Sequence, residues 1–417
     1  MRRITPSEIR RAFELTPQIT FEVTEGCNLR CKYCGYGELF EIASHRRNRA
    51  LPWFKALSIL EYYRAMVQRS NVGHYGREVF FSFFGGEPLL NFSLIEQVVG
   101  WVNRSGIDRF RGVKYSMTTN GLLLHGHEEF LVDNGFNLLI SLDGDERASS
   151  YRKFPDGSSS FALVKKNIDG LKLRHPSYFE EHVKFNAVLN DRSSVGGIID
   201  FIKSEYGKTP SISAINPIGV RPQYAEELDM MSVSVADSIS ASADAGEISN
   251  SMGIQSPFFR KAFDCFRGHS PYFYRGYNEL LYGPSATIAD LLPGGTCIPF
   301  SKRVFISAGG LIMPCENVSH KFALGSIDDD ARVNIDFDEL AQRYNAYYDE
   351  LEPRCARCAR NKSCSECIFH LPHGGDCLRC NEFASHSEMD EEIGRYYDFI
   401  TSVPKFVEVI GNTLEFR

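Results

Sequence analysis

The sequence has neither a long hydrophobic run nor an excess of positive charge, and each shortage excludes a class of protein. No apolar stretch reaches the roughly 20 residues that a transmembrane helix needs. The first 15 residues are polar and amphipathic, without the apolar stretch of a signal peptide. A formal net charge of −7 argues against a broad nucleic-acid-binding surface. We therefore expect a cytoplasmic protein that binds neither membranes nor nucleic acid.

Cysteine is absent from the long middle of the chain. Of the 12 cysteines, three lie between residues 27 and 34, none follows until Cys265, and eight lie between residues 297 and 380. In a cytosolic protein such a number indicates metal or redox chemistry rather than disulfides. The 417 residues, 43% of them hydrophobic, leave room for a sizeable core and for about two or three domains.

The cysteine-free middle predicts alternating strands and helices. Short segments rich in β-branched or aromatic residues are the predicted strands, namely Ile19–Val23, Val79–Phe84, Lys114–Thr119, Asn137–Leu142, Val183–Leu189 and Ser211–Asn216. The helical patterns between them are Pro52–Ser70, Ser93–Asn103, Glu128–Asp133, Phe161–Leu173 and Val195–Glu205. This alternation implies parallel strands with right-handed crossovers. We predict an α/β fold, an open partial (β/α)6 barrel of the TIM type.

Polar and glycine-rich motifs follow the first four predicted strands. They are Glu25-Gly26-Cys27, Gly85-Gly86-Glu87, Thr119-Asn120-Gly121 and Asp143-Gly144. In parallel α/β folds the functional residues gather at the carboxyl ends of the strands. The sequence therefore predicts one site at this rim of the barrel.

The first group of cysteines, Cys27, Cys31 and Cys34, offers three thiolates with no fourth cysteine nearby in the sequence. A 4Fe–4S cluster normally takes four thiolates. Three ligands leave one iron open, just as a catalytic zinc site keeps an open position. An open iron can bind a small chelating ligand and pass it an electron. The alternative is a zinc knuckle with a remote fourth ligand.

The spacing of these cysteines, with Tyr33 before the third, resembles the radical S-adenosylmethionine superfamily. The later Gly85-Gly86-Glu87-Pro88 turn fits the same family. The resemblance implies that the open iron chelates the methionine amino and carboxylate groups, that Tyr33 lies near the adenine, and that the turn meets the amino group. Glycine lets backbone carbonyls approach an ammonium group, and Glu87 adds negative charge.

The segment after the fourth predicted strand resembles the SPASM-type subgroup of that superfamily. The resemblance implies that Ser141 and Asp143 contact the ribose or the methionine part of the cofactor. It implies that Arg152 holds the methionine carboxylate, which a guanidinium can bind in a bidentate fork. Asn120 fits a similar role in lining the cofactor. Each of these four residues alone is also compatible with a turn or a surface position.

The C-terminal cysteines supply the thiolates for two further 4Fe–4S clusters. They are Cys297, Cys315, Cys355, Cys358, Cys364, Cys367, Cys377 and Cys380. Their arrangement resembles the SPASM domain, which carries two auxiliary clusters. It departs from the family in having two residues, rather than three, between Cys364 and Cys367. The alternative is one or two zinc ribbons.

The resemblance also divides these cysteines between the two auxiliary clusters. Cys297, Cys315 and Cys367 are expected to bind the cluster nearer the active site. The distal cluster is expected to take Cys355, Cys358 and Cys364, with Cys377 or Cys380 completing it. Whether Cys265 or the remaining C-terminal cysteine completes the nearer cluster stays open.

The expected domain boundaries follow from these assignments. They are an N-terminal segment (1–18), the partial barrel (19–225), a bridging region (226–296), a SPASM domain (297–385) and a tail (386–417), which looks like a helix and a short strand. Residues 233–251 are expected to be helix or linker, and the aromatic segment 271–277 either surface packing or a peptide-binding wall. The insertion Gly35–Leu51 is expected to shape a peptide pocket or to form a solvated loop.

The resemblance implies cleavage of S-adenosylmethionine to methionine and a 5′-deoxyadenosyl radical that removes hydrogen from a peptide. The leading expectation is a maturase of a ribosomally made precursor peptide that forms a thioether or carbon–carbon cross-link. The runner-up is an anaerobic sulfatase maturase, which makes formylglycine. That family has an Asp after the equivalent of Cys315, where this chain has Glu316, a candidate catalytic base. Flavodoxin or ferredoxin is the expected electron donor. The non-enzyme alternative is an electron carrier or a zinc-binding interaction protein.

Overall fold

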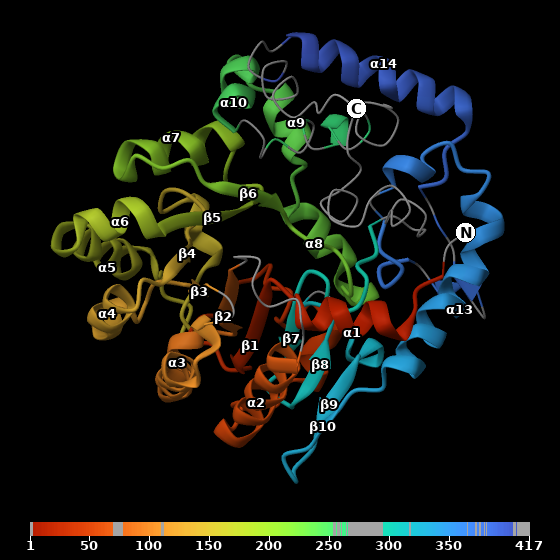
Figure 1. Ribbon diagram of the computed structural model, residues 1–417. Coiled ribbons are helices and arrows are strands. Elements are labelled where there is room, and N and C mark those ends of the chain that lie inside the picture. The colour runs from red at the N-terminus through yellow and green to blue at the C-terminus, as the bar shows by residue number, and fades with distance from the viewer. Residues whose placement is uncertain are drawn as a thin grey trace. The chain divides into compact units, whose positions relative to one another are not determined.

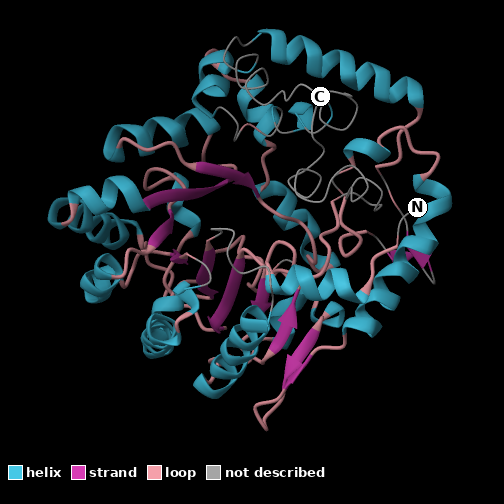
Figure 2. Ribbon diagram, viewed as in Figure 1, coloured by secondary structure: helices cyan, strands magenta, loops and turns pink. Residues whose placement is uncertain are grey.

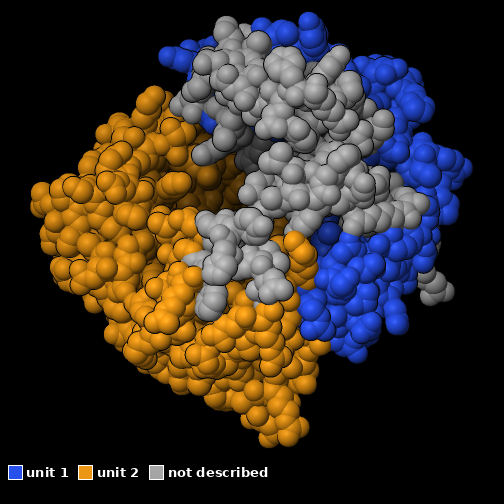
Figure 3. Space-filling model, in the orientation of Figure 1, with its two compact units in different colours: residues 1–10, 242–298, 336–417 blue, residues 11–241, 299–335 orange. Residues whose placement is uncertain are grey.

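The computed structural model describes most of the chain and divides it into two compact units (Figure 3). It describes residues 3–69, 78–109, 112–252, 256, 259, 261–263, 265, 295–316, 318–364, 366–371, 373–374, 377–378, 380, 382–402 and 406. One unit comprises residues 11–241 and 299–335, and the other comprises residues 1–10, 242–298 and 336–417. The predicted segment 297–385 is thus shared between the two units. Within the described residues, no helix combines the length and apolar content needed to cross a bilayer.

Six parallel strands form the centre of the larger unit, in the order of the sequence (Figure 1). They are β1 (Gln18–Thr24), β2 (Val79–Gly85), β3 (Val113–Thr119), β4 (Asn137–Ser141), β5 (Val183–Leu189) and β6 (Ser211–Ala214). Each strand pairs in parallel with the next. The α/β fold with six parallel strands that the sequence predicts is therefore confirmed, with boundaries accurate to within two residues.

Helices cover the outer side of these strands (Figure 2). They are α2 (Trp53–Arg69), α3 (Phe92–Ser105), α4 (Leu124–Asp133), α5 (Phe161–Arg174), α6 (Pro176–His182) and α7 (Val195–Tyr206). Local signals set some ends: the Ser194 hydroxyl caps α7 by accepting from the Gly197 N–H, and Gly207 ends it in the left-handed conformation. Two shorter helices, α8 (Ala225–Met231) and α9 (Val235–Ser240), follow β6.

The larger unit contains strands that the sequence does not predict. β7 (Val304–Ile306) pairs in parallel with β1 on the side away from β2. Three antiparallel strands, β8 (Leu311–Met313), β9 (Gly325–Ile327) and β10 (Val333–Asn334), extend the sheet to ten strands. β1 is therefore an interior strand, and six of its seven residues are buried.

The described residues of the smaller unit are mainly helical. Its long helices are α13 (Phe337–Cys355) and α14 (His386–Ser402), beside α10 (Ala245–Met252) and two short strands, β11 (His373–Gly374) and β12 (Cys377–Leu378). Residues of helix α1 (Pro6–Glu14) belong to both units. The expected helix-or-linker segment contains α9 and α10, and the expected tail helix is α14. The aromatic segment 271–277 and the short strand expected in the tail lie outside the described residues.

Candidate functional site

The cluster-binding loop directly follows β1. Cys27, Cys31 and Cys34 lie close enough that the charge on one thiol affects the pKa of another. Burial raises the pKa of Cys31 to about 12 and raises that of Cys27 as well. The free thiols of Cys27 and Cys31 therefore hold their protons, and binding iron would displace them. Three soft sulfur donors grouped at a strand end fit the iron–sulfur cluster that the sequence implies.

Backbone hydrogen bonds fix this loop to the segment that follows the fourth strand. The Arg30 N–H donates to the Lys153 carbonyl at 2.7 Å, and the Lys32 N–H donates to the Tyr151 carbonyl at 3.2 Å. These bonds bring Arg152, predicted from a distant part of the sequence, next to the cysteines. The Arg152 charge indeed lowers the pKa of Cys31 against the dominant effect of burial.

Asp143, Arg152 and Tyr33 form one buried network. The Arg152 Nε and Nη2 atoms donate to the two carboxylate oxygens of Asp143 at 2.9 and 2.8 Å. The Tyr33 hydroxyl and the Val188 N–H donate to the same carboxylate. Asp143 is fully buried and already accepts four hydrogen bonds from the chain. These bonds hold Arg152 and Tyr33 in place, and the cofactor contact that the resemblance implies for Asp143 stays a prediction.

The glycines of the Gly85–Pro88 turn are required by the close packing of backbone on backbone. Gly85 has a φ of 144°, and a Cβ atom there would lie 2.3 Å from the Thr24 carbonyl oxygen. A Cβ on Gly86 would lie 2.1 Å from the Gly26 carbonyl oxygen. The turn is thereby pressed against the residues that lead into Cys27, and Pro88 is buried behind it. The sequence identifies the turn, and the structure adds this reason for its glycines.

Glu87 is completely buried and serves as an acceptor for the end of the third strand. Its carboxylate accepts from the Thr119 hydroxyl at 2.8 Å, the Asn120 N–H at 2.8 Å and the Leu89 N–H at 3.2 Å. Asn120 in turn donates from its side chain to the Asn28 amide oxygen at 2.8 Å and to the Cys27 sulfur at 3.9 Å. Glu87 therefore supports a chain of contacts that ends at a predicted cluster ligand. Ser141 is the half-buried last residue of β4.

Glu87 leads to a prediction about pH. Burial raises the pKa of Glu87 from 4.5 to about 7, although its three hydrogen bonds oppose the shift. Between these pH values the folded protein binds more protons than the unfolded chain, so stability falls as the pH rises through the window. The whole shift corresponds to about 3 kcal/mol.

We expect Glu87→Gln to remove this dependence. Thermal unfolding of both proteins from about pH 5 to about pH 8 measures the pH dependence of stability. Across that range the wild type is expected to lose stability while the variant does not, so the variant becomes more stable relative to the wild type. Glu96→Gln, which changes an exposed carboxylate on α3, is the control. Parallel pH profiles for wild type and Glu87→Gln would contradict the expectation.

A second group of polar side chains lies beside the loop and is not identified from the sequence. The Arg46 guanidinium lies 4.0 Å from the centre of the Tyr36 ring and pairs with the buried Glu22 at 2.7 Å. Burial raises the pKa of Tyr36, and the charges of Glu22, Glu316 and Cys34 raise it further. Tyr36 therefore lies within electrostatic reach of both Cys34 and Glu316. Its position two residues after Cys34 is the only sequence signal for it.

Glu316 follows Cys315 in the larger unit, shortly after β8. Its carboxylate pairs with Arg303 at 2.5 Å, and its side chain is 22% exposed. The predicted base thus lies just after β8, in the part of the ten-stranded sheet that β7 and β8 form. Arg303 keeps this carboxylate paired with a positive charge and fixes its direction.

The insertion Gly35–Leu51 is anchored at both ends. Near its start, the Glu41 N–H donates to the Gly219 carbonyl at 2.8 Å, and the Arg221 N–H donates to the Leu39 carbonyl at 2.9 Å. Near its end, Arg49 pairs with the buried Glu25 at 2.7 Å. The insertion therefore connects the end of β1 with the segment after β6. Of the two expectations, this anchoring favours a wall of the site over a free loop.

Four of the C-terminal cysteines gather around one pocket of the smaller unit. Cys355, Cys358, Cys364 and Cys380 all line it. Burial raises the pKa of Cys355 to about 12, and the other three thiols raise it further. This group matches the donor set of a 4Fe–4S cluster. Of the two residues that compete for the last position, Cys380 lies here, and the side chain of Cys377 lies outside the described residues.

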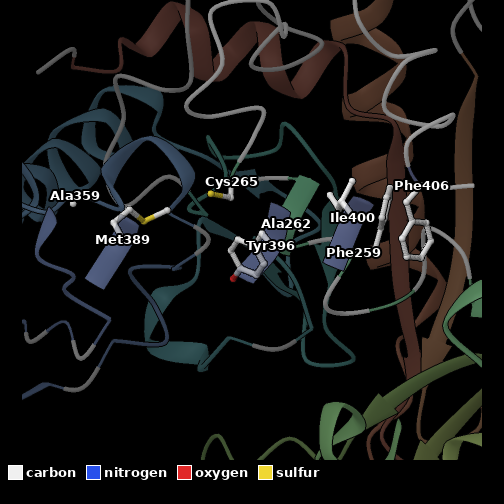
Figure 4. Close-up of a cluster of buried hydrophobic side chains, with 8 residues drawn as sticks. All are labelled: Phe259, Ala262, Cys265, Ala359, Met389, Tyr396, Ile400 and Phe406. Carbon is white, nitrogen blue, oxygen red and sulfur yellow. The ribbon is translucent and has the colours of Figure 1, made fainter. Parts of the chain in front are cut away.

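The other cysteines lie in different surroundings. Cys297 and Cys367 both raise the pKa of Tyr348, which burial raises first, so these two thiols lie beside the same phenol. Cys315 belongs to the larger unit. Cys265 is buried in an apolar cluster of the smaller unit (Figure 4). Burial raises the pKa of Cys265 to about 11, and the described cysteines are not among the residues that shift it.

Comparisons with known proteins agree with this geometry. The radical SAM superfamily matches residues 21–183. The radical SAM cyclopropyl synthase TigE of Paramaledivibacter caminithermalis is 28% identical over 195 residues, which are 45% of this chain and 37% of that protein. The cysteine-type anaerobic sulfatase-maturating enzyme of Clostridium perfringens is 23% identical over 413 residues, 93% of this chain and 96% of that enzyme.

Solved structures show the same fold. The structure of histidine-tagged anSMEcpe with bound AdoMet has a TM-score of 0.60 at 18% identity, over 96% of each chain. The cysteine loop, the Gly85–Pro88 turn and the Asp143–Arg152 pair all lie within or beside the ends of the strands in the matched region. Residues 21–183 therefore form a radical S-adenosylmethionine domain.

Proposed function

We propose that the protein oxidises a side chain of a peptide or protein substrate by radical chemistry. One observation carries the proposal. The three-cysteine loop, the Gly85–Pro88 turn and the network of Arg152, Asp143 and Tyr33 lie together at one rim of the barrel. When bound, the cluster and S-adenosylmethionine supply a 5′-deoxyadenosyl radical that removes a hydrogen atom from the substrate. The residues of the chain hold the cofactor, aim it and exclude water.

The roles of the cofactor-binding residues follow from their contacts. Asp143 engages Nε and Nη2 of Arg152, which leaves Nη1 directed to the methionine carboxylate in our proposal. Tyr33 is fixed through the same carboxylate and would lie against the adenine. Asn120 would complete the cofactor pocket beside Cys27. Glu87 would hold Asn120 in position by accepting a hydrogen bond from its backbone N–H.

Glu316 is the proposed base. Loss of a hydrogen atom leaves a substrate radical, and oxidation of that radical to a neutral product releases one electron and one proton. A carboxylate near the substrate can accept this proton. Glu316 lies within electrostatic reach of Tyr36, which is in turn close to Cys34, and Arg303 orients its carboxylate. This arrangement supports proton transfer on the same side of the barrel as the cluster loop.

Two auxiliary 4Fe–4S clusters complete the proposal, for three clusters per chain. The distal one would take the four cysteines that line the pocket of the smaller unit. The nearer one would take Cys297, Cys315 and Cys367. Both would serve the oxidation of the substrate rather than the chemical cleavage of S-adenosylmethionine.

Two products fit the proposal. Formylglycine formation from Cys or Ser is favoured by the likeness to sulfatase-maturating enzymes, which extends over nearly the whole chain. A thioether or carbon–carbon cross-link in a ribosomally made peptide is favoured by Glu316, which stands where sulfatase maturases have Asp. The partial likeness to the cyclopropyl synthase TigE supports carbon–carbon bond formation. We favour formylglycine formation, because it accounts for more of the chain.

The products can be told apart with the anaerobically reconstituted enzyme, S-adenosylmethionine and a reductant. One reaction receives a cysteine-containing peptide from a sulfatase, and the other receives short peptides encoded beside the gene. Formylglycine carries an aldehyde that a hydrazide probe captures, whereas a cross-linked peptide loses hydrogen and gives no hydrazone. Cleavage of S-adenosylmethionine without any change in peptide mass, across both sets, would contradict a peptide substrate.

A further inference from the structure

The loop that carries three of the four pocket cysteines is locally basic. Between Pro353 and Cys364 the sequence contains Arg354, Arg357, Arg360 and Lys362 but no acidic residue. The chain as a whole has a net charge of −7. Of the charged residues that line the four-cysteine pocket, two are basic, Arg354 and Arg360, and one is acidic, Glu382, so this lining carries the opposite sign of charge from the protein as a whole.

Two of these arginines are available to a partner. Arg354 and Arg357 are exposed, and neither forms an ion pair with a carboxylate in the described part of the chain. Arg360 is already used, because it pairs with Glu382 at 2.8 Å and with Glu392 at 2.6 Å. The acidic residue at the pocket mouth, Glu382, is thereby neutralised, while Arg354 and Arg357 keep their charge.

An exposed aromatic side chain accompanies the arginines. Phe383 is 39% exposed, and the Arg354 guanidinium lies 5.5 Å from the centre of its ring. Both residues line the same pocket as the four cysteines. Arginine beside an exposed aromatic ring is typical of protein–protein interfaces, where such residues contribute most of the binding energy.

The proposed reaction moves single electrons. Cleavage of S-adenosylmethionine consumes one electron, and oxidation of the substrate radical releases one electron together with a proton. The released electron either returns to the catalytic cluster, which balances the turnover, or leaves through an auxiliary cluster to a one-electron carrier, and the first reduction of the enzyme also needs such a carrier. A protein carrier must approach a redox centre closely, and a basic rim attracts an acidic carrier.

We propose that Arg354, Arg357 and Phe383 form a docking surface for a small acidic electron-carrier protein. The surface places the carrier at the mouth of the four-cysteine pocket. This inference rests on the proposed function, because it takes the pocket to hold an iron–sulfur cluster. The partner is defined by its chemistry, as an acidic protein with a one-electron cofactor near its surface.

Binding of an acidic flavodoxin to the iron-loaded enzyme tests the proposal. Arg354→Glu combined with Arg357→Glu is expected to weaken binding by about 10-fold or more at low ionic strength, and the difference is expected to shrink as salt is added. Arg354→Lys with Arg357→Lys keeps the charge and is expected to bind nearly as wild type. Arg104→Glu with Arg109→Glu makes the same charge change on exposed residues of the larger unit and is expected to leave the affinity unchanged.

Iron content and the spectrum after reduction by dithionite, a small reductant, separate the two proposals. If the double Arg→Glu variant keeps its iron and spectrum but loses affinity, the docking surface is supported. If it keeps both its iron and its affinity for flavodoxin, or if the wild-type enzyme binds no flavodoxin, the docking surface is wrong and the proposed function stands. If the wild-type pocket holds no iron–sulfur cluster, the proposed function fails in this part, and the docking surface fails with it.

Discussion

Replacing Cys27, Cys31 and Cys34 together with Ala is expected to abolish the cleavage of S-adenosylmethionine. The three thiols are grouped on the loop after β1, next to Arg152, and are the proposed ligands of the catalytic cluster. Without that cluster no electron reaches the cofactor. The iron content is expected to fall from about twelve to about eight atoms per chain, because one of three 4Fe–4S clusters is lost. Iron analysis and chromatographic detection of 5′-deoxyadenosine measure both effects.

Cys265→Ala is the matched control for this experiment. Cys265 is buried among apolar side chains of the smaller unit, so its loss removes a thiol but no proposed ligand of the catalytic cluster. We expect its 5′-deoxyadenosine formation to equal that of wild type. Persistent cleavage by the triple variant would show that the catalytic cluster is bound elsewhere.

Glu316→Gln is expected to separate cofactor cleavage from product formation. Glutamine keeps the shape of the side chain but cannot accept the proton that leaves the substrate radical. Cleavage of S-adenosylmethionine should continue, while oxidised peptide falls by about 10²–10⁴-fold, as is typical for loss of a general base. Quantifying 5′-deoxyadenosine and peptide product in the same reaction measures the uncoupling.

The structural alternative for Glu316 is its ion pair with Arg303. If pairing is its only role, the variant would lose stability without a change in the ratio of product to 5′-deoxyadenosine. Glu96→Gln, on the exposed face of α3, controls for the loss of a carboxylate elsewhere. Unchanged product formation by Glu316→Gln would exclude it as the base.

The repeating parts of the fold could be predicted because they have a local signal. The strand Val183–Leu189 has apolar residues at alternate positions and turn residues, Asn190 and Asp191, directly after its end, and the predicted bounds agree with those observed. β7, β8 and β9 have three residues each, too few for any periodic pattern. β7 pairs with β1, hundreds of residues away, and spacing within one segment carries no record of that pairing, whereas β8 and β9 pair with the neighbouring β7 and β8.

The site shows the same limit. Spacing alone identified Cys27, Cys31 and Cys34, since ligands of one metal centre are often close in sequence. Spacing could not show that the Asp143 carboxylate accepts hydrogen bonds from Arg152, Tyr33 and Val188, because those contacts depend on which groups meet after folding. Arg46 was missed for the same reason, as its partner Glu22 is an unremarkable residue within a strand.

The parallel pairing of β7 with β1 also determines the order in which the protein can be assembled. Ile19 pairs with Val304, so the strand that leads into the cluster loop gains its second neighbour only after most of the chain has been synthesised. Until then the edge of β1 is an unpaired row of backbone groups that can pair with another chain. Contacts between residues so distant in sequence form slowly, and exposed edges in such intermediates favour aggregation. A chain truncated before residue 299 would keep every proposed ligand of the catalytic cluster, but it would leave one edge of β1 unpaired.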